Sequence, residues 1–260
     1  MKLSIVTPSF NGRRYLGQTS RSILTQAGDF DLEWVVVDGG STDGTAEFLR
    51  SLDADPRVRW ASEKDRGQSD AINKGMAAAA GDVVAWLNAD DLYTPGALGA
   101  VATAFAENPG AQWLTGRCEI IDAEGRVIRP SVTRYKERSL RRYAYRALLR
   151  ENFISQPAVF WRRDFGARVG SLDESLHYTM DYDLWLRMGR AAPPLFLDRV
   201  LAQFRLHETS KTGQVNREQF DEQYRVAGRY FGDDRASRWV HRLNVEKIVW
   251  AYRVMRAAGL

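Results

Sequence analysis

An amide and two carboxylates at the end of a short apolar run are the residues with the clearest chemical potential. Val83–Leu87 is followed directly by Asn88, Ala89, Asp90 and Asp91. A short continuous apolar run predicts a strand buried on both faces of a sheet. Two adjacent carboxylates at its end repel each other unless a positive charge lies there, and a divalent cation with oxygen ligands fits best. The simpler alternative is that both aspartates only cap the turn that follows.

A second polar group follows two earlier apolar runs. Thr7, Pro8 and Ser9 come after the first run, and Asp38 comes after the next. Asp38 could accept hydrogen bonds from a ribose or a base, as acidic residues do in nucleotide-binding sheets. Equally, it could form the turn before Gly39.

A third group opens a predicted helix. It runs from Asp65 through Gly67 to Asp70. The backbone amides at such an N-terminus favour a phosphate or a polar base edge. A fourth group, around Asp181, pairs with His207 much later in the chain.

Strands and helices must alternate to position these groups. The predicted strands of the first half are Leu3–Thr7, Trp34–Val37, Arg57–Ala61 and Val83–Leu87. The predicted helices are Tyr15–Gln26, Thr45–Leu52, Ser69–Ala80 and Pro95–Glu107. This alternation predicts a mostly parallel sheet with helices on both faces. Ligands bind at the carboxyl ends of such strands, so we expect Thr7, Asp38 and Asp90 along one edge.

The second half is less regular. Its predicted strands are Gln112–Ile121, Arg126–Arg129, Ala158–Trp161 and Phe196–Phe204, and its predicted helices are Tyr182–Arg190 and residues 216–260. The sequence contains no internal repeat and no Pro/Gly-rich linker. We therefore expect one main domain with a helical extension.

Composition predicts a folded cytoplasmic protein. The chain has 260 residues, of which 44% are hydrophobic, enough for a sizeable core. No run approaches the roughly 18 apolar residues of a membrane span, and the N-terminus lacks a signal-peptide pattern. The single cysteine, Cys118, is expected to be a buried inert thiol in a reducing compartment.

The charge is unevenly distributed. Residues 134–150 carry a net charge of +6 and residues 235–260 one of +5, which leaves −7 for the rest. An acidic body with basic patches does not favour nucleic-acid binding. It fits an enzyme that binds to an anionic surface.

Two basic segments could make peripheral contact with the inner face of a membrane. Residues 238–256 interleave arginines with tryptophans, a pattern that suits the lipid headgroup region. An equally weighted alternative is that this C-terminal helix packs on the domain or on the second subunit of a homodimer. Within 134–150, Arg141 and Arg142 could likewise face a lipid phosphate or an acceptor diphosphate.

Seven short motifs follow one another between residues 3 and 212: Val6-Thr-Pro-Ser-Phe-Asn11, Val37-Asp-Gly-Gly-Ser-Thr-Asp-Gly44, Gly67-Gln-Ser-Asp-Ala-Ile-Asn73, Trp86-Leu-Asn-Ala-Asp-Asp91, Gln156-Pro-Ala-Val-Phe160, Asp181-Tyr-Asp-Leu-Trp-Leu-Arg187 and Arg205-Leu-His207. Their ordered succession closely resembles family 2 of the inverting glycosyltransferases. The resemblance implies an α/β protein of the GT-A fold, in which a mostly parallel nucleotide-binding sheet joins an acceptor-binding region. On this basis 1–212 is the GT-A domain, with a nucleotide-sugar half (1–110) and an acceptor and catalytic half (111–212). Residues 213–260 form a C-terminal helical extension.

The resemblance also implies roles for individual residues. Asp90 holds Mn²⁺ or Mg²⁺ against the donor diphosphate, with support from Asp91 and His207. Asp181 is the general base that deprotonates the acceptor hydroxyl. The donor nucleotide sugar is bound by Thr7, Pro8, Ser9, Asp38, Asp65, Gly67, Asp70, Asn88 and Ala89.

Several positions leave these roles open. Asn88 stands where many members carry an aspartate, so coordination rests mainly on Asp90. Asp183 is a rival for the base, although it could instead cap the helix that it begins. Arg205 and Lys211 could neutralise diphosphate, but solvated surface charge is the simpler expectation for both.

The sequence thus predicts a metal-dependent inverting glycosyltransferase. It would move a sugar from a nucleotide-diphosphate donor to a hydroxyl of a saccharide or lipid-linked acceptor by a single displacement. A non-catalytic nucleotide-sugar-binding protein and a nucleotidyltransferase are the alternatives.

Overall fold

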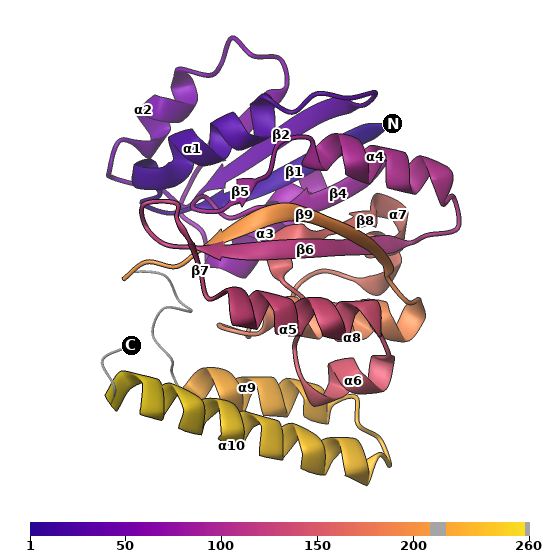
Figure 1. Ribbon diagram of the computed structural model, residues 1–260. Coiled ribbons are helices and arrows are strands. Elements are labelled where there is room, and N and C mark those ends of the chain that lie inside the picture. Colours follow the sequence, from indigo (N-terminus) through magenta and orange to yellow (C-terminus); the bar gives the residue numbers. More distant parts are fainter. Residues whose placement is uncertain (209–216, 258–260) are drawn as a thin grey trace.

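The computed structural model describes residues 1–208 and 217–257, and nine strands form its central sheet (Figure 1). The strands are β1 Lys2–Ser9, β2 Asp31–Asp38, β3 Val58–Ser62, β4 Val83–Trp86, β5 Leu92–Tyr93, β6 Trp113–Ile121, β7 Val127–Ile128, β8 Val159–Arg162 and β9 Leu195–Arg205. Their order is β3-β2-β1-β4-β8-β6-β9-β5, with β7 beside β6. The first four strands along this order are parallel, whereas β8 runs antiparallel to both of its neighbours.

Helices cover both faces of the sheet, as predicted. They are α1 Arg13–Leu24, α2 Thr45–Arg50, α3 Gln68–Ala78, α4 Ala97–Glu107, α5 Pro130–Arg141, α6 Tyr145–Arg150, α7 Arg163–Val169, α8 Met180–Ala191, α9 Arg217–Gly228 and α10 Arg235–Ala257, with a 3₁₀ turn η1 at Gln156–Ala158. Alternate strand residues enter two separate cores: Val83 and Ala85 pack with α1, α2 and α4, whereas Val84 and Trp86 pack with α3 and α5–α9. Successive residues of a strand point to opposite faces, and both faces are covered here. Both sets of residues are therefore buried, which explains why the strand sequences are continuous apolar runs.

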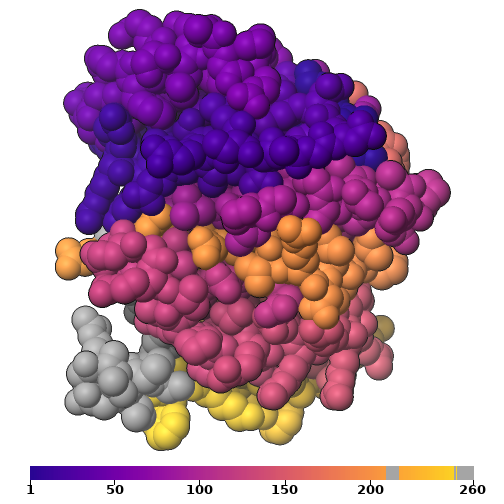
Figure 2. Space-filling model, turned by 45° about the horizontal axis from the view of Figure 1, so that its top comes forward, coloured from indigo at the N-terminus to yellow at the C-terminus, as the bar shows by residue number. Residues whose placement is uncertain are grey.

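The C-terminal helices lie together at one end of the molecule. Helix α10 packs on α6 and α9, and α9 packs on α8 (Figure 1). In the space-filling view the indigo N-terminal half and the yellow C-terminal helices lie at opposite ends, with orange residues of β9 between them (Figure 2). The predicted boundary between residues 212 and 213 lies outside the described residues, and the division into domains stays a prediction.

Several elements differ from the expected ones. The predicted helix 95–107 begins at Ala97, because Leu92 and Tyr93 pair with β9 and Gly96 starts the helix in the left-handed region (φ 72°). Helices α5, α6 and α7 were not predicted. The helical stretch predicted over 216–260 is two helices among the described residues, separated by a turn that contains Gly232 (φ 50°).

Candidate functional site

Asp38 lies at the end of β2 with its carboxylate buried and occupied by protein donors. The Ser41 backbone N–H and the Ser62 hydroxyl donate to one carboxylate oxygen, at 2.9 and 2.6 Å, and the Ser41 hydroxyl donates to the other. These bonds hold the turn after the strand, as the simpler interpretation of Asp38 expects. A role toward a ribose or base stays a prediction.

The end of β1 contains a buried hydroxyl without a partner. Thr7 and Pro8 are buried, and Thr7 accepts a hydrogen bond from the Trp34 indole at 2.8 Å, whereas the Ser9 hydroxyl has no hydrogen-bond partner. A side chain at Gly12 would approach within 2.9 Å of that hydroxyl and 3.0 Å of Ala89. A residue larger than glycine at position 12 would therefore have to displace Ser9 or Ala89.

The Asp65–Asp70 segment lies against the same edge. A side chain at Gly39, next to Asp38, would strike the Asp65 carboxylate, so the two aspartates are close. Gly67 begins α3 with φ 120°, a conformation that favours glycine. Asp70 is almost fully buried and is bound by the backbone N–H of Arg66 and by ion pairs. Its bonds stabilise the start of α3.

Asn88 joins three elements. Its amide oxygen accepts a hydrogen bond from Gln68 at 3.0 Å, and its amide nitrogen donates to Asp91 at 3.2 Å and to Gln156 at 3.3 Å. Gln156 in turn donates to the Trp86 carbonyl at 2.7 Å. An aspartate would lack the two N–H donors that Asn88 supplies here. The neutral residue therefore suits this position structurally.

Asp90 and His207 lie side by side, although 117 positions separate them. His207 Nε2 is 2.9 Å from Asp90 Oδ2, and both side chains keep some exposure. Leu92 pairs with Gln203 in antiparallel register, which carries Asp90 to the end of β9 just before His207. The two residues therefore form one candidate ligand pair.

This pair suits a divalent cation. Two ligands about 2.1 Å from an octahedral cation, at right angles, lie about 3.0 Å apart, close to the separation of Asp90 and His207. The described residues contain no group of three or more His, Cys, Asp or Glu side chains that could hold a metal alone. Two protein ligands are the usual number where substrate phosphates complete the coordination.

Asp91, by contrast, points into the protein. It is fully buried, and the Arg205 backbone N–H and the Asn88 amide donate to its two carboxylate oxygens, at 2.9 and 3.2 Å. Burial, and then the charge of Asp90, raise its pKa well above the ordinary value. Its described contacts support the loop rather than a ligand.

Arg205 is not the solvated charge that was expected. Its side chain is 1% exposed and donates to the backbone carbonyls of Asp90, Asp122 and Ala123 and to the Gln18 amide oxygen. A buried guanidinium is stable only when its donors are satisfied in this way. Arg205 therefore holds the Asp90 loop in place. Lys211 lies outside the described residues.

Asp181 lies in the first turn of α8 in a largely desolvated setting. Burial raises its pKa to about 6, although the Tyr182 backbone N–H, Lys136 and the Asn152 side chain each act to lower it. The amide oxygen of Asn152 has no hydrogen-bond partner. A half-buried carboxylate with a raised pKa is suited to proton transfer.

Lys136 was counted in a basic surface segment, but it turns inward. Its ammonium donates to Ser155 at 3.2 Å, and burial lowers its pKa while Cys118 and Asp181 act to raise it. Cys118 is a free, buried thiol, as predicted, and burial raises its pKa to about 12.

Asp183, the rival base, is committed elsewhere. It is buried and accepts hydrogen bonds from Arg187 at 2.9 Å and from the Tyr230 hydroxyl at 2.8 Å. The expectation that it caps the helix is wrong, because Thr179 precedes the first turn and Asp183 lies within it. Its bonds tie α8 to the segment after α9.

Glu222 of α9 fixes the loop in front of Asp181. Its carboxylate accepts the backbone N–H groups of His177, Tyr178 and Thr179 and the Thr179 hydroxyl, at 2.8 to 3.1 Å. Burial alone would raise its pKa, but these donors lower it below the ordinary value. Nothing in the sequence pattern predicted this contact, because the residues are more than 40 positions apart.

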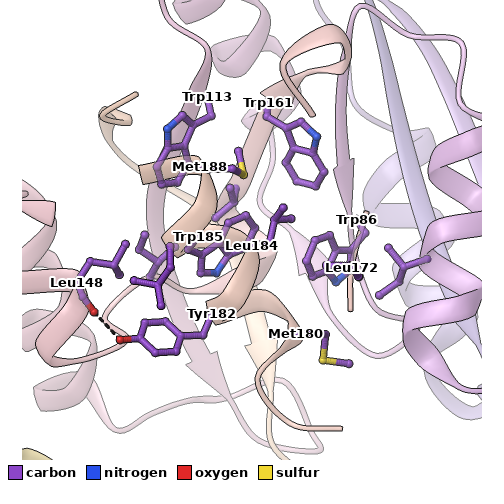
Figure 3. Close-up of a cluster of buried hydrophobic side chains, with 14 of the residues drawn as sticks. Trp86, Trp113, Leu148, Trp161, Leu172, Met180, Tyr182, Leu184, Trp185 and Met188 are labelled. Carbon is purple, nitrogen blue, oxygen red and sulfur yellow. Dashed lines mark hydrogen bonds between the residues drawn. The ribbon is translucent and has the colours of Figure 1, made fainter. Parts of the chain in front are cut away.

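A tryptophan cluster connects α8 with β4 (Figure 3). Trp185 stacks on Trp86 with ring centroids 5.6 Å apart and on Trp113 at 6.1 Å. Trp185 follows Asp181 by one helical turn, and Trp86 precedes Asp90 by four residues. The cluster therefore holds α8, which carries Asp181, against the strand that leads to the candidate metal ligands.

Residues 4–167 match the family described as glycosyl transferase family 2. An uncharacterised glycosyltransferase of Rickettsia conorii is 27% identical over 220 residues, which cover 82% of this chain and 35% of that protein. The chain spans between 35% and 40% of the length of the first curated relatives that it matches.

Two solved structures are similar in fold. The mannosyltransferase PcManGT from Pyrobaculum calidifontis, in complex with GDP-Man and Mn²⁺, has a TM-score of 0.70 at 18% identity and covers 99% of this chain and 76% of its own. S. aureus TarS in complex with UDP-GlcNAc has a TM-score of 0.67 at 18% identity, covering 89% and 67%. Their likeness confirms the predicted GT-A fold. Since the family match extends over more than half of its residues, the chain belongs to glycosyl transferase family 2.

Proposed function

We propose that this protein is a metal-dependent, inverting glycosyltransferase that uses Asp181 as its general base. The donor is a nucleotide-diphosphate sugar, and the acceptor is a hydroxyl of a saccharide or of a lipid-linked molecule. The observation that carries the proposal is the arrangement of two chemically different carboxylates around one strand. Asp90 pairs with His207 beyond the end of β4, and Asp181 lies on the helix that packs on β4.

Asp90 and His207 bind Mn²⁺ or Mg²⁺ in this proposal. A divalent cation would neutralise the negative charge that develops on the departing diphosphate. The chain supplies the two ligands and holds them through Arg205, which bonds the Asp90 carbonyl. The relative with bound GDP-Man and Mn²⁺ supports this choice of cofactor.

The nucleoside would lie along the ends of β1 and β2. Asp38 and Asp65 lie close together there, and the Ser9 hydroxyl is buried without a partner. The aromatic ring of Phe10 is 68% exposed at this edge and offers a flat surface for a base. The bound UDP-GlcNAc and GDP-Man of the structural relatives support a nucleotide-sugar donor.

Asp181 removes the proton from the acceptor hydroxyl as that oxygen attacks the anomeric carbon. The bond between this carbon and the diphosphate oxygen breaks, and its electron pair leaves with the nucleoside diphosphate. One displacement without a covalent sugar–enzyme intermediate inverts the configuration. With a pKa of about 6, the carboxylate is mostly ionised at neutral pH and is a stronger base than an ordinary aspartate.

The test is a thermal-shift panel of UDP-, GDP- and dTDP-sugars with and without Mn²⁺. We expect one nucleotide series to raise the unfolding temperature, and Mn²⁺ to increase that shift. No metal-enhanced shift in any series would argue against the proposal.

A second assay separates the alternatives. Release of nucleoside diphosphate from the stabilising donor supports transfer, whereas a non-catalytic binding protein releases none. Release of pyrophosphate from a nucleoside triphosphate and a sugar phosphate would instead indicate a nucleotidyltransferase.

The proposed location is the cytoplasm, with peripheral contact at the inner face of the membrane, where lipid-linked acceptors are presented. None of the described helices is long and apolar enough to cross a bilayer. The proposed membrane contact requires a lipid-binding surface, and helix α10 is the candidate for it.

A further inference from the structure

Helix α10 has one side that belongs to the core of the C-terminal region. His241 and Ser237 are fully buried, and Val245 is nearly so. The His241 ring bonds the Leu149 carbonyl at 2.8 Å, and Arg150 donates to the Ser237 hydroxyl at 3.0 Å. This side fixes α10 against α6 and leaves the opposite side facing outward.

The outward side carries large apolar side chains. Trp239 is 64% exposed, Trp250 is 68% exposed and Leu243 is 36% exposed. Their spacing of four and seven residues places all three on one stripe of the helix. The other tryptophans of the chain are buried or partly buried. Two tryptophans exposed on one stripe are an unusual surface for a folded protein.

Cations flank this stripe. The exposed residues Arg235, Arg242 and Lys247 lie beside it, whereas Arg238 packs over the Phe231 ring at 5.7 Å. Among the described side chains of α10, the single acidic one is Glu246, which pairs with Arg217 of α9 at 3.4 Å. The outward side is therefore both apolar and strongly positive.

We propose that this side of α10 docks on an anionic lipid bilayer, with the helix lying in the plane of the headgroups. Tryptophan rings favour that region because they combine an apolar body with a polar N–H group. Arginine and lysine beside them bind lipid phosphate and are attracted by the negative surface potential. This inference extends the proposed peripheral location, and it does not depend on sugar transfer.

The charge argues against a second copy of the chain as the occupant. A symmetric contact through α10 would bring the stripe of each copy against the same stripe of its partner. The cations of one copy would then lie on the same interface as those of the other, with one acidic side chain per copy, Glu246, to offset them. Like charges across an interface repel each other, whereas an anionic bilayer complements them.

The experiment is sedimentation of the purified chain with vesicles of phosphatidylcholine, with and without phosphatidylglycerol. We expect binding to the anionic vesicles only, and weaker binding as salt is raised. Replacing Arg242 and Lys247 together by Gln should weaken binding about 25-fold, since each cation near an anionic surface contributes about fivefold. The Trp239→Ala/Trp250→Ala variant should reduce binding at least as much.

The matched control is Arg21→Gln/Arg50→Gln, which removes the same charge from exposed positions on α1 and α2. It should bind vesicles as the unmodified chain does, and circular dichroism should show all variants folded. Equal binding by the α10 variants, or no binding by the unmodified chain, would overturn the proposal. A dimer in light scattering that the tryptophan variant converts to a monomer would also overturn it and assign the surface to a second copy.

Discussion

The two sides of the candidate site are held in place by different means. Asp90 and His207 come together through strand register. Strand β5, which follows Asp90, pairs with β9, which ends just before His207. Asp181 is held by helices, through Trp185 stacked on Trp86 and through Glu222 bonded to the loop in front of it. The proposed metal side thus depends on the sheet, and the proposed base side depends on side chains from distant parts of the chain.

This difference has a functional consequence. A position set by backbone pairing tolerates most changes of neighbouring side chains, whereas a position set by a few buried polar contacts does not. The base side should therefore be the more easily disturbed of the two. The first three predictions therefore compare a variant on one of the two sides with a matched variant at a nearby residue.

The largest effect is expected from Asp181→Asn. Loss of a general base lowers kcat by roughly a hundredfold to ten-thousandfold, and donor affinity should stay unchanged because Asp181 acts on the acceptor. Asp183→Asn is the matched variant two residues away. The folded Asp183→Asn variant should keep most of its activity. Its free energy of unfolding should fall, because the substitution weakens the hydrogen bonds to Arg187 and Tyr230.

Nucleoside diphosphate release and calorimetric donor binding measure both variants. An active Asp181→Asn enzyme beside an inactive but folded Asp183→Asn enzyme would reverse the assignment of the base.

The next effect concerns the two adjacent carboxylates after β4. Asp90→Asn should remove the Mn²⁺-dependent part of donor stabilisation and lower transfer roughly a hundredfold, since it weakens a metal ligand. Asp91→Asn should keep the metal effect and lower the free energy of unfolding by about 1–2 kcal/mol, because one buried donor loses its acceptor. Thermal shift with and without Mn²⁺ separates them, and equal loss of the metal effect would contradict the inward role of Asp91.

A smaller effect is expected from Glu222→Gln. The amide keeps one acceptor oxygen for Tyr178 and Thr179 but turns an N–H group toward the His177 N–H. We expect kcat to fall about tenfold through misplacement of Asp181, with the KM for the donor unchanged.

Glu218→Gln, on the same helix, is the control. A rise in donor KM equal to the fall in kcat would show that Glu222 does not act on the base side alone.

The smallest effect is a change in pH dependence. Asp181 works as the carboxylate, so kcat/KM should fall below about pH 6 as it takes up a proton. Lys136→Met removes a positive charge that lowers this pKa, so the fall should begin at a higher pH. A profile that does not move in Lys136→Met would place the titrating group elsewhere.

The contribution of Asp181 to folding stability should have the opposite pH dependence. Whereas kcat/KM falls at low pH, this contribution becomes unfavourable at high pH. The raised pKa means that the folded state favours protonated Asp181, so its burial costs nothing below the ordinary aspartate pKa and most above about pH 6. Asp181→Asn should therefore be more stable than the unmodified chain at pH 8 but not at pH 4. Thermal unfolding at both values measures this difference.

The sequence predicted the parallel part of the sheet well. Apolar runs and alternating elements predict parallel strands, and the ends of parallel strands converge, which is why Asp38 and Asp65 lie together. Asp90 and His207, assigned to one metal site from the ordered motifs, are in contact in the structure. The proximity of Asp90 and His207 was expected from the family resemblance rather than from local pattern. Asp91, assigned to the same metal site, points into the protein instead.

The base side could not be predicted to the same degree. Lys136 was counted with surface cations because a charged residue in a basic segment gives no sign that it turns inward. On the proposed metal side, too, one residue was misjudged: Arg205 was expected in solvent, and only the carbonyl groups around it explain its burial. Glu222 reaches its loop across more than 40 residues, and such contacts leave no periodic pattern in the chain.

The chemistry of the Glu222 contact bears on how this protein can diversify. Three of its four donors are backbone N–H groups, which every residue except proline provides. The side chains at His177 and Tyr178 can therefore be exchanged without loss of the contact. New side chains could therefore evolve on this loop while Asp181 keeps its position.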